Sequence, residues 1–452
     1  MKIRFFAALY AAKLTARIID IVARGRGTNL PGQIALKIDP KFVSHIKGLD
    51  PGKTIFVTGT NGKSTTTNLI AHIFKTAGVK LAVNLEGANL IGGVVVSLLK
   101  NCGLDGRLKA DFVLMETDER FLPIIYKHLP AGHLCITNIQ KDQVQRNGEP
   151  EIIRRKIKSI LNPDITMYVN GDEPNALSLA ADAGKSIQYG VERNSRSFDK
   201  KDDFFSVSMP CPKCHEPIRF ETYNVDNIGP FVCDNCGFET GKNKYMATDV
   251  DFENKTFTLD GEKFSFAYST PYFLYSYVAA LTVAKEFGIS YEDIRRAFPT
   301  FELVGGRMES IRIDNKEVKY IRMKQENPET LQSAINVIAS DKNDKVFMLG
   351  LGEIMDFDPY YTNTFYTWDC DFRELVKSEI EKCICFSDKV VYDAAIRLLY
   401  DGMDENKLVI LPTNDDKAIV EEVKKCDSDN IYLITLMYKF ESLAKYVKQE
   451  AK

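Results

Sequence analysis

The chain has 452 residues, of which 44% are apolar, so it is too long for one core and we expect two or three domains. Its 59 basic and 62 acidic residues give a net charge of −3, which excludes a bulk electrostatic affinity for nucleic acid. Ten cysteines fall in two tight pairs and otherwise in scattered or apolar surroundings, such as Cys135, Cys383 and Cys385. This distribution favours a reducing cytoplasm over a disulfide framework.

The first 26 residues combine the short apolar run 5–12 with basic residues on both sides. The run is too short to span a bilayer, and Arg17, Arg24 and Arg26 argue against a signal peptide. We expect a basic amphipathic helix that packs on the domain behind it. The alternative is peripheral contact with anionic lipid at the inner face of the membrane, which gains support only if the substrate is lipid-linked.

Residues 54–67 predict a phosphate-binding loop between a β-branched strand and a helix. The loop residues are Gly59, Thr60, Asn61, Gly62, Lys63, Ser64 and Thr65. Backbone amides at the glycines would face a nucleotide, Lys63 would reach its β- and γ-phosphates, and the Ser64 hydroxyl would bind Mg²⁺. Val57 stands where the eight-residue Walker pattern has glycine, so the shorter form G-T-N-G-K-[ST]-T fits better. A plain strand-to-helix connection is the alternative.

The runs 54–58, 111–116, 133–137 and 166–169 alternate with helical stretches, which predicts a parallel α/β sheet buried on both faces. The second run ends in Glu116, at the sheet edge where the phosphates are expected. Carboxylate oxygens are ligands that Mg²⁺ prefers, so we assign Glu116 as a magnesium ligand. Ordinary solvation of a loop is the alternative.

Two C-x₂-C pairs separated by eighteen residues predict a tetrahedral structural zinc site in an inserted ribbon. The ligands are Cys211, Cys214, Cys233 and Cys236. His215 follows a ligand directly and is expected to face solvent rather than the metal. Zinc ribbons can also bind nucleic acid, but little excess basic charge surrounds these cysteines, so stabilisation of an inserted lobe is the expected role.

Three segments divide the chain. Residues 1–49 form the N-terminal helix and a lead-in, residues 50–304 the ATP-binding domain with the insert at about 206–245, and residues 305–452 a second α/β domain. Hairpin strands at 252–259 and 262–268 and a helix at 272–287 return the chain to the first domain. The paired glycines before Arg307 predict a hinge. Strands at 345–349, 382–386, 407–411 and 430–436 then build a smaller open sheet.

Several motifs together resemble the Mur ligase superfamily. They are G-T-N-G-K-S-T at 59–65, T-N-I at 137–139 with D-Q at 142–143 and G-E at 148–149, G-D-E-P at 171–174, and G-R-x-E at 306–309. The match covers nearly the whole chain. The run 27–40, the four-cysteine insert and the lack of a UDP-binding N-terminal domain are similar to the MurT branch, the ligase-like subunits of lipid II isoglutaminyl synthase. This resemblance implies a Mur-ligase-type P-loop domain with a parallel sheet and a smaller Rossmann-like C-terminal domain.

The resemblance also implies a reaction in peptidoglycan synthesis. ATP phosphorylates the α-carboxylate of D-glutamate in lipid II, and ammonia from a glutaminase subunit displaces the phosphate to leave D-isoglutamine. Lys63, Ser64, Glu116 and Asn138 would contact Mg·ATP, and Arg307 would approach the phosphates on domain closure. In this family a C-terminal aspartate completes the partner's Cys-His pair. The matching W-D-x-D-F segment is 368–372.

We assign that role to Asp369, and Asp371 is the nearby alternative. A structural alternative is that Asp369 only caps the helix that follows. The chain departs from the family at Phe273 and Ser276, where asparagines are expected to contact adenine or ribose, and in the segments 140–142 and 350–358. Two other functions stay open. One is a Mur-like amino-acid ligase such as a folylpolyglutamate synthase, and the other is a scaffold gated by nucleotide.

Overall fold

The computed structural model describes residues 2–22, 29–84, 89–142, 148–199, 209–268, 270–302, 308–321, 327–352 and 365–450. The chain divides into two compact units. The first holds residues 1–140, 147–201 and 206–303, and the second holds 141–146, 202–205 and 304–452. Within the described ranges, no helix is both long enough and apolar enough to cross a membrane.

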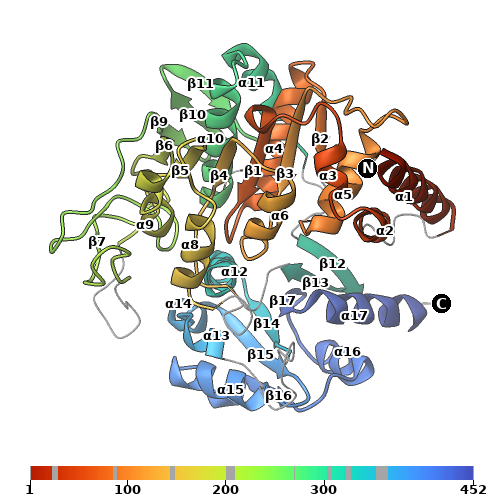
Figure 1. The fold of residues 1–452 in the computed structure, drawn as a ribbon. Helices are drawn as coiled ribbons and strands as arrows, with labels where there is room; N and C mark the ends of the chain where they lie inside the picture. Colours follow the sequence, from red (N-terminus) through yellow and green to blue (C-terminus); the bar gives the residue numbers. More distant parts are fainter. Residues whose placement is uncertain are drawn as a thin grey trace. The chain divides into compact units, whose positions relative to one another are not determined.

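The first unit is built on a sheet whose described strands have the order β11-β10-β9-β6-β5-β4-β1-β3-β2 (Figure 1). Neighbouring strands from β2 through to β9 run parallel, and β9, β10 and β11 form an antiparallel meander at one edge. The strands are β1 (Thr54–Thr58), β2 (Leu81–Val83), β3 (Phe112–Glu116), β4 (His133–Ile136), β5 (Thr166–Asn170), β6 (Lys185–Val191), β9 (Tyr245–Asp251), β10 (Thr256–Leu259) and β11 (Glu262–Ser265).

The central strands are buried on both faces because successive side chains enter opposite cores. On β1, Phe56 joins one core while Ile55 and Val57 join the other. Helices cover each face of this sheet (Figure 1). They are α1 (Lys2–Val22), α2 (Leu30–Ile38), α3 (Phe42–His45), α4 (Lys63–Thr76), α5 (Ile91–Lys100), α6 (Leu122–His128), α8 (Pro150–Lys158), α9 (Pro174–Leu177), α10 (Pro271–Glu286) and α11 (Tyr291–Ala297), with short 3₁₀ turns η1 (Pro51–Lys53), η2 (Ala180–Asp182) and η3 (Phe298–Thr300).

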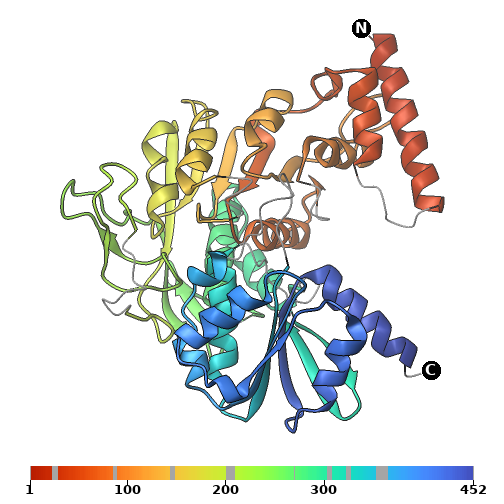
Figure 2. The ribbon, with the colours of Figure 1, turned by 90° about the horizontal axis from the view of Figure 1, so that it is seen from below.

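The N-terminal helix α1 packs through Phe5, Ala8, Leu9 and Ala12, which are all buried in the core that Phe56 joins. It lies beside α2 (Figures 1 and 2). Gly32 of α2 lets the two backbones of α2 and α5 approach, because a Cβ added there would stand 2.0 Å from the carbonyl oxygen of Gly92. The expected packing of the N-terminal helix on the domain behind it is therefore present.

The insert between β6 and β9 carries a small two-stranded sheet of β7 (Arg219–Phe220) and β8 (Phe231–Val232). Ile218, Phe231 and Phe238 of the insert pack with the buried thiols Cys211 and Cys233 in the core that Phe56 joins.

The second unit has a six-stranded sheet of order β12-β13-β17-β14-β15-β16, in which β12 is antiparallel to β13 and the other pairs are parallel. The strands are β12 (Met308–Ile313), β13 (Lys316–Ile321), β14 (Lys345–Gly350), β15 (Ile380–Phe386), β16 (Leu408–Leu411) and β17 (Asn430–Thr435). The helices are α12 (Pro328–Ser340), α13 (Phe365–Trp368), α14 (Arg373–Val376), α15 (Val391–Tyr400), α16 (Asp416–Lys424) and α17 (Met437–Glu450), with the 3₁₀ turn η4 (Glu405–Lys407).

One predicted strand is only partly present in the structure. Of the run 252–259, residues 256–259 form strand β10, whereas residues 252–255 form the turn between β9 and β10. The Asp251 carboxylate accepts hydrogen bonds from the amides of Glu253 (3.0 Å) and Asn254 (2.9 Å), and Lys255 has a positive φ of 55°. Local hydrogen bonds of an aspartate side chain therefore stop the β-branched pattern from continuing.

Candidate functional site

The phosphate-type loop connects β1 to α4 and depends on two glycines. Gly59 has a φ of 132° and Gly62 a φ of 80°. A Cβ on Gly59 would lie 2.2 Å from the Thr137 hydroxyl and 2.7 Å from the Asn138 carbonyl oxygen, so a larger residue cannot fit. The first intrahelical bond of α4 is donated by Thr66 to Gly62 O (2.8 Å), and the preceding amides lie at the open end of the helix.

The segment after β4 holds this loop in place. Thr60 N donates to Asn138 O (2.9 Å), Asn61 N donates to Asn138 Oδ1 (2.9 Å), and Asn138 Nδ2 returns a bond to Asn61 O (3.0 Å). The Thr137 hydroxyl also donates to Asn61 O (2.7 Å). The structure thus brings Asn138 to the loop, as a residue that fixes the loop backbone.

Lys63 points back along the loop. Its ammonium donates to the carbonyl oxygens of Gly59 and Thr60, the latter at 3.1 Å, and forms an ion pair with Glu119 Oε2 at 2.9 Å. Both side chains are buried, whereas Ser64 is exposed. Lys63 is therefore neutralised inside the loop, and Ser64 is open to a ligand.

Glu116 is the last residue of β3 and lies opposite Val57 in the parallel register. Its backbone pairs with the Asn84 side chain, which accepts from Glu116 N and donates to Glu116 O, both at 2.8 Å. Glu116 and Glu119 are both buried at the carboxyl edge of the sheet. A second acidic residue thus joins the one predicted from the sequence, because the chain turns back after the strand.

Two adjacent buried carboxylates follow β5. Glu173 caps α9 and accepts hydrogen bonds from the amides of Ile139 (3.0 Å), Asn175 (3.0 Å) and Ala176 (2.8 Å). It therefore ties the segment after β4 to the segment after β5. Removal of this carboxylate from water raises its pKa to about 7, against the opposing effect of the three amide bonds.

Asp172 connects the sheet to α10 and to the insert. Its Oδ2 accepts from Val191 N (2.8 Å) and from the Tyr275 hydroxyl (2.8 Å), and its Oδ1 accepts from Asn243 Nδ2 (3.1 Å). Tyr275 in turn accepts a bond from Asn224 Nδ2 at 3.1 Å. Burial raises the pKa of Asp172 to about 6.

A cavity of about 10 Å³ lies between the loop and α10. It is lined by Asn61 and Gly62 on one side and by Tyr272 and Ser276 on the other. The buried Asn170 also lines it, and its Nδ2 has no hydrogen-bond partner among the described residues. Ser276 stands next to Gly62, since a Cβ on that glycine would lie 3.2 Å from the serine hydroxyl. The cavity has room for about one water molecule.

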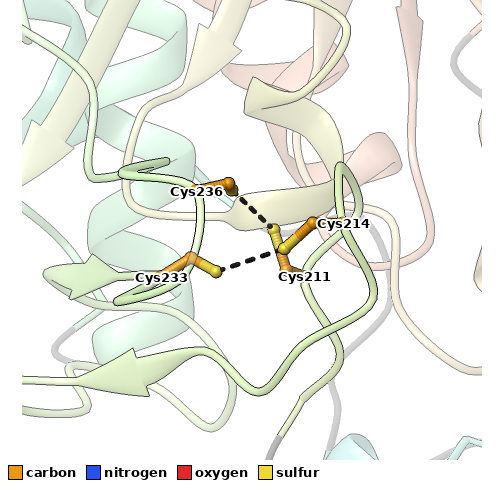
Figure 3. Close-up of side chains that lie close together, drawn as sticks. All are labelled: Cys211, Cys214, Cys233 and Cys236. Atoms are coloured by element: carbon orange, nitrogen blue, oxygen red, sulfur yellow. Dashed lines mark hydrogen bonds between the residues drawn. The ribbon is translucent and has the colours of Figure 1, made fainter.

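The four cysteines of the insert converge (Figure 3). Their sulfur atoms all lie within 4.8 Å of one another, with Cys211 3.7 Å from Cys236 and Cys214 3.5 Å from Cys233. A tetrahedral zinc with bonds of about 2.3 Å needs sulfur separations of roughly 3.8 Å, and a disulfide needs about 2 Å. The thiols are therefore spaced for a metal ion.

The two C-x₂-C turns have the same pattern of backbone hydrogen bonds. Cys211 N donates to Glu216 O (2.8 Å) and Cys233 N to Phe238 O (2.7 Å), while His215 N and Gly237 N each bond back to the first cysteine at 2.9 Å. His215 and Gly237 share a left-handed conformation, with φ of 68° and 69°. His215 thus takes a turn position that suits glycine, and among the described residues only the four cysteines form the metal-type cluster.

In the second unit, the segment 367–372 is fixed from α15. The fully buried Arg397 donates to Thr367 O (3.2 Å) and to Cys370 O (2.7 Å), and it pairs with Asp401. Asp401 Oδ2 accepts from Phe372 N (2.8 Å). The backbone on both sides of Asp369 is therefore held by one buried ion pair.

The two candidate aspartates of this segment have different contacts. Asp371 accepts from Arg373 N (2.9 Å), Nε (2.9 Å) and Nη2 (2.6 Å), so it serves the start of α14. Asp369 is partly exposed and forms an ion pair with Lys141 of the same unit, at 3.0 Å. Arg307, the third predicted catalytic residue, lies outside the described residues.

Comparison with known proteins assigns the family. The Mur ligase middle domain matches residues 57–225, and the MurT ligase C-terminal domain matches residues 325–438. The chain is a MurT-like member of the Mur ligase superfamily. Membership implies ATP and Mg²⁺ for this Mur ligase, and the helix amides, Lys63 and exposed Ser64 at the loop fit a phosphate ligand with its metal.

The similar proteins extend over most of the chain. The lipid II isoglutaminyl synthase (glutamine-hydrolyzing) subunit MurT of Staphylococcus aureus (strain COL) is 28% identical over 383 residues, 84% of each chain. The subunit of the same name from Streptococcus pneumoniae (strain ATCC BAA-255 / R6) is 26% identical over 430 residues, 93% of this chain and 92% of the relative.

Solved structures share the fold at low identity. A pseudomurein peptide ligase type C from Methanothermus fervidus has a TM-score of 0.64 at 17% identity and covers 90% of this chain and 79% of its own. MurF from Acinetobacter baumannii has a TM-score of 0.61 at 15% identity, and the match covers 91% of this chain and 80% of the MurF chain. These likenesses support a Mur-ligase-type α/β fold for this chain.

Sequence reasoning missed several residues of this Mur ligase that the structure brings to the site. In the first unit they are Asn84, Glu119, Asn170, Asp172, Glu173 and Tyr275, and in the second unit Arg397 holds the segment around Asp369. The G-D-E-P motif at 171–174 was a signal for two of them, but it does not indicate that both carboxylates are buried. Arg397 had no signal, because an arginine in an amphipathic helix is usually exposed.

The pKa of Asp172 predicts a pH-dependent stability. A carboxyl group whose folded pKa is raised above its unfolded value near 3.9 stabilises the fold fully below pH 4 and loses that contribution as the pH rises through 6. In Asp172→Asn the substituted amide can still accept from Val191 N–H and the Tyr275 hydroxyl, and it can donate to Asn243 Oδ1, which has no partner among the described residues.

We expect Asp172→Asn to match the wild type in urea unfolding at pH 4 and to be more stable at pH 8, by on the order of 2 kcal/mol. Glu173 is unchanged in both proteins, so its own titration cancels in the comparison. A variant that is less stable than the wild type at pH 8 would mean that the hydrogen bonds favour the Asp172 anion.

Proposed function

We propose that this chain is the ligase subunit of a lipid II isoglutaminyl synthase, which works with a glutaminase subunit at the cytoplasmic face of the membrane. The observation that carries the proposal is the match to the MurT C-terminal domain, because the middle domain alone is shared by Mur ligases in general. The two MurT relatives support it further, since each match extends over at least 84% of this chain.

In the proposed reaction, an oxygen of the D-glutamate α-carboxylate attacks the γ-phosphorus of ATP and ADP leaves. Ammonia then attacks the acyl carbon, a proton is lost, and phosphate leaves to give D-isoglutamine. Lys63 would exchange its loop carbonyls and Glu119 for the phosphates. Ser64 with Glu116 or Glu119 would hold Mg²⁺, and Arg307 would add charge at the transferring phosphoryl group.

Lys63→Ala tests the phosphate site. We expect at least a hundred-fold loss of ADP formation with lipid II, because the main positive charge at the phosphates is removed. The two loop glycines and the Asn138 bonds set the backbone without Lys63, so circular dichroism should be unchanged. Lys75→Ala, at the exposed C-terminal end of the same helix, is the matched control and should keep full activity. Full turnover by Lys63→Ala would contradict the assignment.

The four cysteines are proposed to bind one structural zinc ion. Support comes from the closed set of four thiols, whose sulfur atoms all lie within 4.8 Å of one another. Asp172, Tyr275 and Asn224 connect this lobe to the sheet, so the metal would hold one wall of the cavity beside the loop.

The doubly substituted Cys233→Ser, Cys236→Ser protein should contain no zinc, while the wild type should contain one ion per chain by mass spectrometry of metals. We expect the insert to be cut by trypsin first in this variant, because metal binding contributes folding free energy. His215→Gly keeps all four thiols and relieves a left-handed residue, so it should retain the metal. Zinc-free wild-type protein after gentle purification would contradict the site.

The partner is proposed to approach Asp369. An exposed apolar patch lies beside it, and one face of α15 supplies most of that patch. Its residues are Trp368, Tyr392, Ile396, Leu399 and Tyr400. Trp368 contacts Tyr400 with ring centroids 5.8 Å apart, which joins the Asp369 segment to that helix face. Aromatic and aliphatic side chains grouped in this way suit a protein interface.

Asp369→Asn tests the role of this aspartate by changing the nitrogen source. If Asp369 completes the partner's catalytic pair, the variant with its partner should amidate lipid II with ammonium chloride but lose activity with glutamine, by roughly a hundred-fold or more. Glu374→Gln is the control, because Glu374 is an exposed carboxylate of the same region. Loss with both nitrogen sources would assign Asp369 to structure, and no loss would contradict the role.

The same assay separates the rival functions. Turnover that requires a free amino acid and ignores ammonia would indicate an amino-acid ligase of the folylpolyglutamate synthase kind. No ADP with lipid II and either nitrogen source would indicate a scaffold that only binds nucleotide. Phe273 and Ser276 replace two asparagines that are expected to contact the nucleotide. We propose that the Ser276 hydroxyl, which lies beside Gly62, takes over one of these contacts.

A further inference from the structure

The outward face of α1 is apolar although it covers no described part of the protein. Five large apolar residues are exposed along the helix, and their exposed fractions are Ile3 87%, Tyr10 50%, Leu14 61%, Ile18 51% and Ile21 80%. Leu104 beside them is 64% exposed, and its carbonyl oxygen accepts from the Tyr10 hydroxyl at 3.3 Å. Single exposed apolar residues are normal, but a continuous row of them marks a binding surface.

These residues form one stripe. With about 100° of rotation per residue, positions 3, 10, 14, 18 and 21 fall within roughly 80° of the helix circumference. The small Ala7 lies inside the same sector and is also exposed. At 21 residues, α1 is about 30 Å long, so the stripe extends along the whole helix.

The opposite face already accounts for the folding of this helix. Phe5, Ala8, Leu9 and Ala12 are buried, and Phe5 stacks on Phe42 with ring centroids 5.2 Å apart. The helix is therefore held in place by its inward face. The outward stripe contributes nothing to the core, so its apolar surface is available to a binding partner.

Basic side chains border the stripe on both edges. Arg17 and Lys13 follow one edge and Arg4 the other, while Asp20 is the single acidic residue of the helix. Lys13 Nζ donates to Leu99 O at 2.8 Å, and Arg4 Nε donates to Ile38 O, so the charged ends of both side chains are held beside the helix. An apolar stripe between cationic borders is the pattern of helices that lie in the plane of an anionic lipid surface.

We propose that the outward face of α1 binds the surface of a bilayer that contains anionic lipid, with the helix axis in the membrane plane. The inference rests on the proposed function, because a lipid-linked acceptor would require the enzyme to work at the bilayer. No described helix can span a membrane, which fits contact with the surface only. Association with a second copy through this face would oppose like charges at its borders, so lipid is the better match.

Vesicle flotation of the full chain tests this inference. We expect binding to vesicles of phosphatidylcholine with phosphatidylglycerol, weaker binding to phosphatidylcholine alone, and loss of the difference at high salt. Leu14→Glu with Ile18→Glu should weaken binding at least ten-fold, because two charges would enter the apolar layer. Both positions are exposed, so the fold should persist. Ile152→Glu, at an exposed apolar position on α8, is the control and should bind like the wild type.

The outcomes separate the inference from the proposed function. The vesicles contain no lipid II and no nucleotide, so absence of flotation, or flotation that survives the double substitution, overturns the membrane surface alone. Sedimentation that shows a dimer abolished by the double substitution, without vesicle binding, would assign the stripe to a second copy. With lipid II in detergent micelles, the double variant should amidate at the wild-type rate, and failure of the wild type in that assay would instead overturn the function.

Discussion

The close approach of Gly59 to the segment after β4 is the constraint on which the rest of the site depends. A single methyl group at Gly59 would collide with Thr137 and Asn138, and both residues bond to the loop. The loop is thus shaped by a neighbouring strand as well as by its own glycines. Because Glu173 fixes Ile139 from the end of β5, three parallel strands share one hydrogen-bonded edge.

The insert belongs to the same arrangement. Asn224 and Asn243 reach Asp172 directly or through Tyr275, and Gly229 N donates to Asp172 O at 3.0 Å. The cysteine cluster therefore lies in a lobe whose polar contacts end beside the cavity at the β1–α4 loop. In the second unit, the buried pair of Arg397 and Asp401 has a comparable role, since it fixes the backbone around an exposed carboxylate. In each unit, a buried polar network thus fixes the backbone next to a candidate functional group: Asp172 beside the cavity in the first unit, and Arg397 with Asp401 around Asp369 in the second.

Local patterns in the sequence were sufficient to predict those elements whose geometry follows directly from residue type and spacing. The glycine loop, the two C-x₂-C turns and the strands β1, β14 and β17 are examples, because residue type and periodicity decide each of them. The sequence could not indicate which carboxylate after β3 turns back to Lys63, since that depends on the path of the chain beyond Glu116. It could not show that Asp172 and Glu173 are buried, because acidic residues after a strand are usually solvated. It also placed a strand through residues 252–255, where the Asp251 side chain forms a turn.

The ion pair between Lys63 and Glu119 has a consequence for how ligands enter. A phosphate group bound to Lys63 would take the place of Glu119 and would leave a buried carboxylate without its counter-charge. A divalent cation beside that carboxylate would restore the balance, so nucleotide and metal would each favour the binding of the other. Thermodynamic linkage makes this coupling reciprocal. The ion pair of Lys63 would therefore disfavour a phosphate that binds without its metal, because Glu119 would then be an unpaired buried charge.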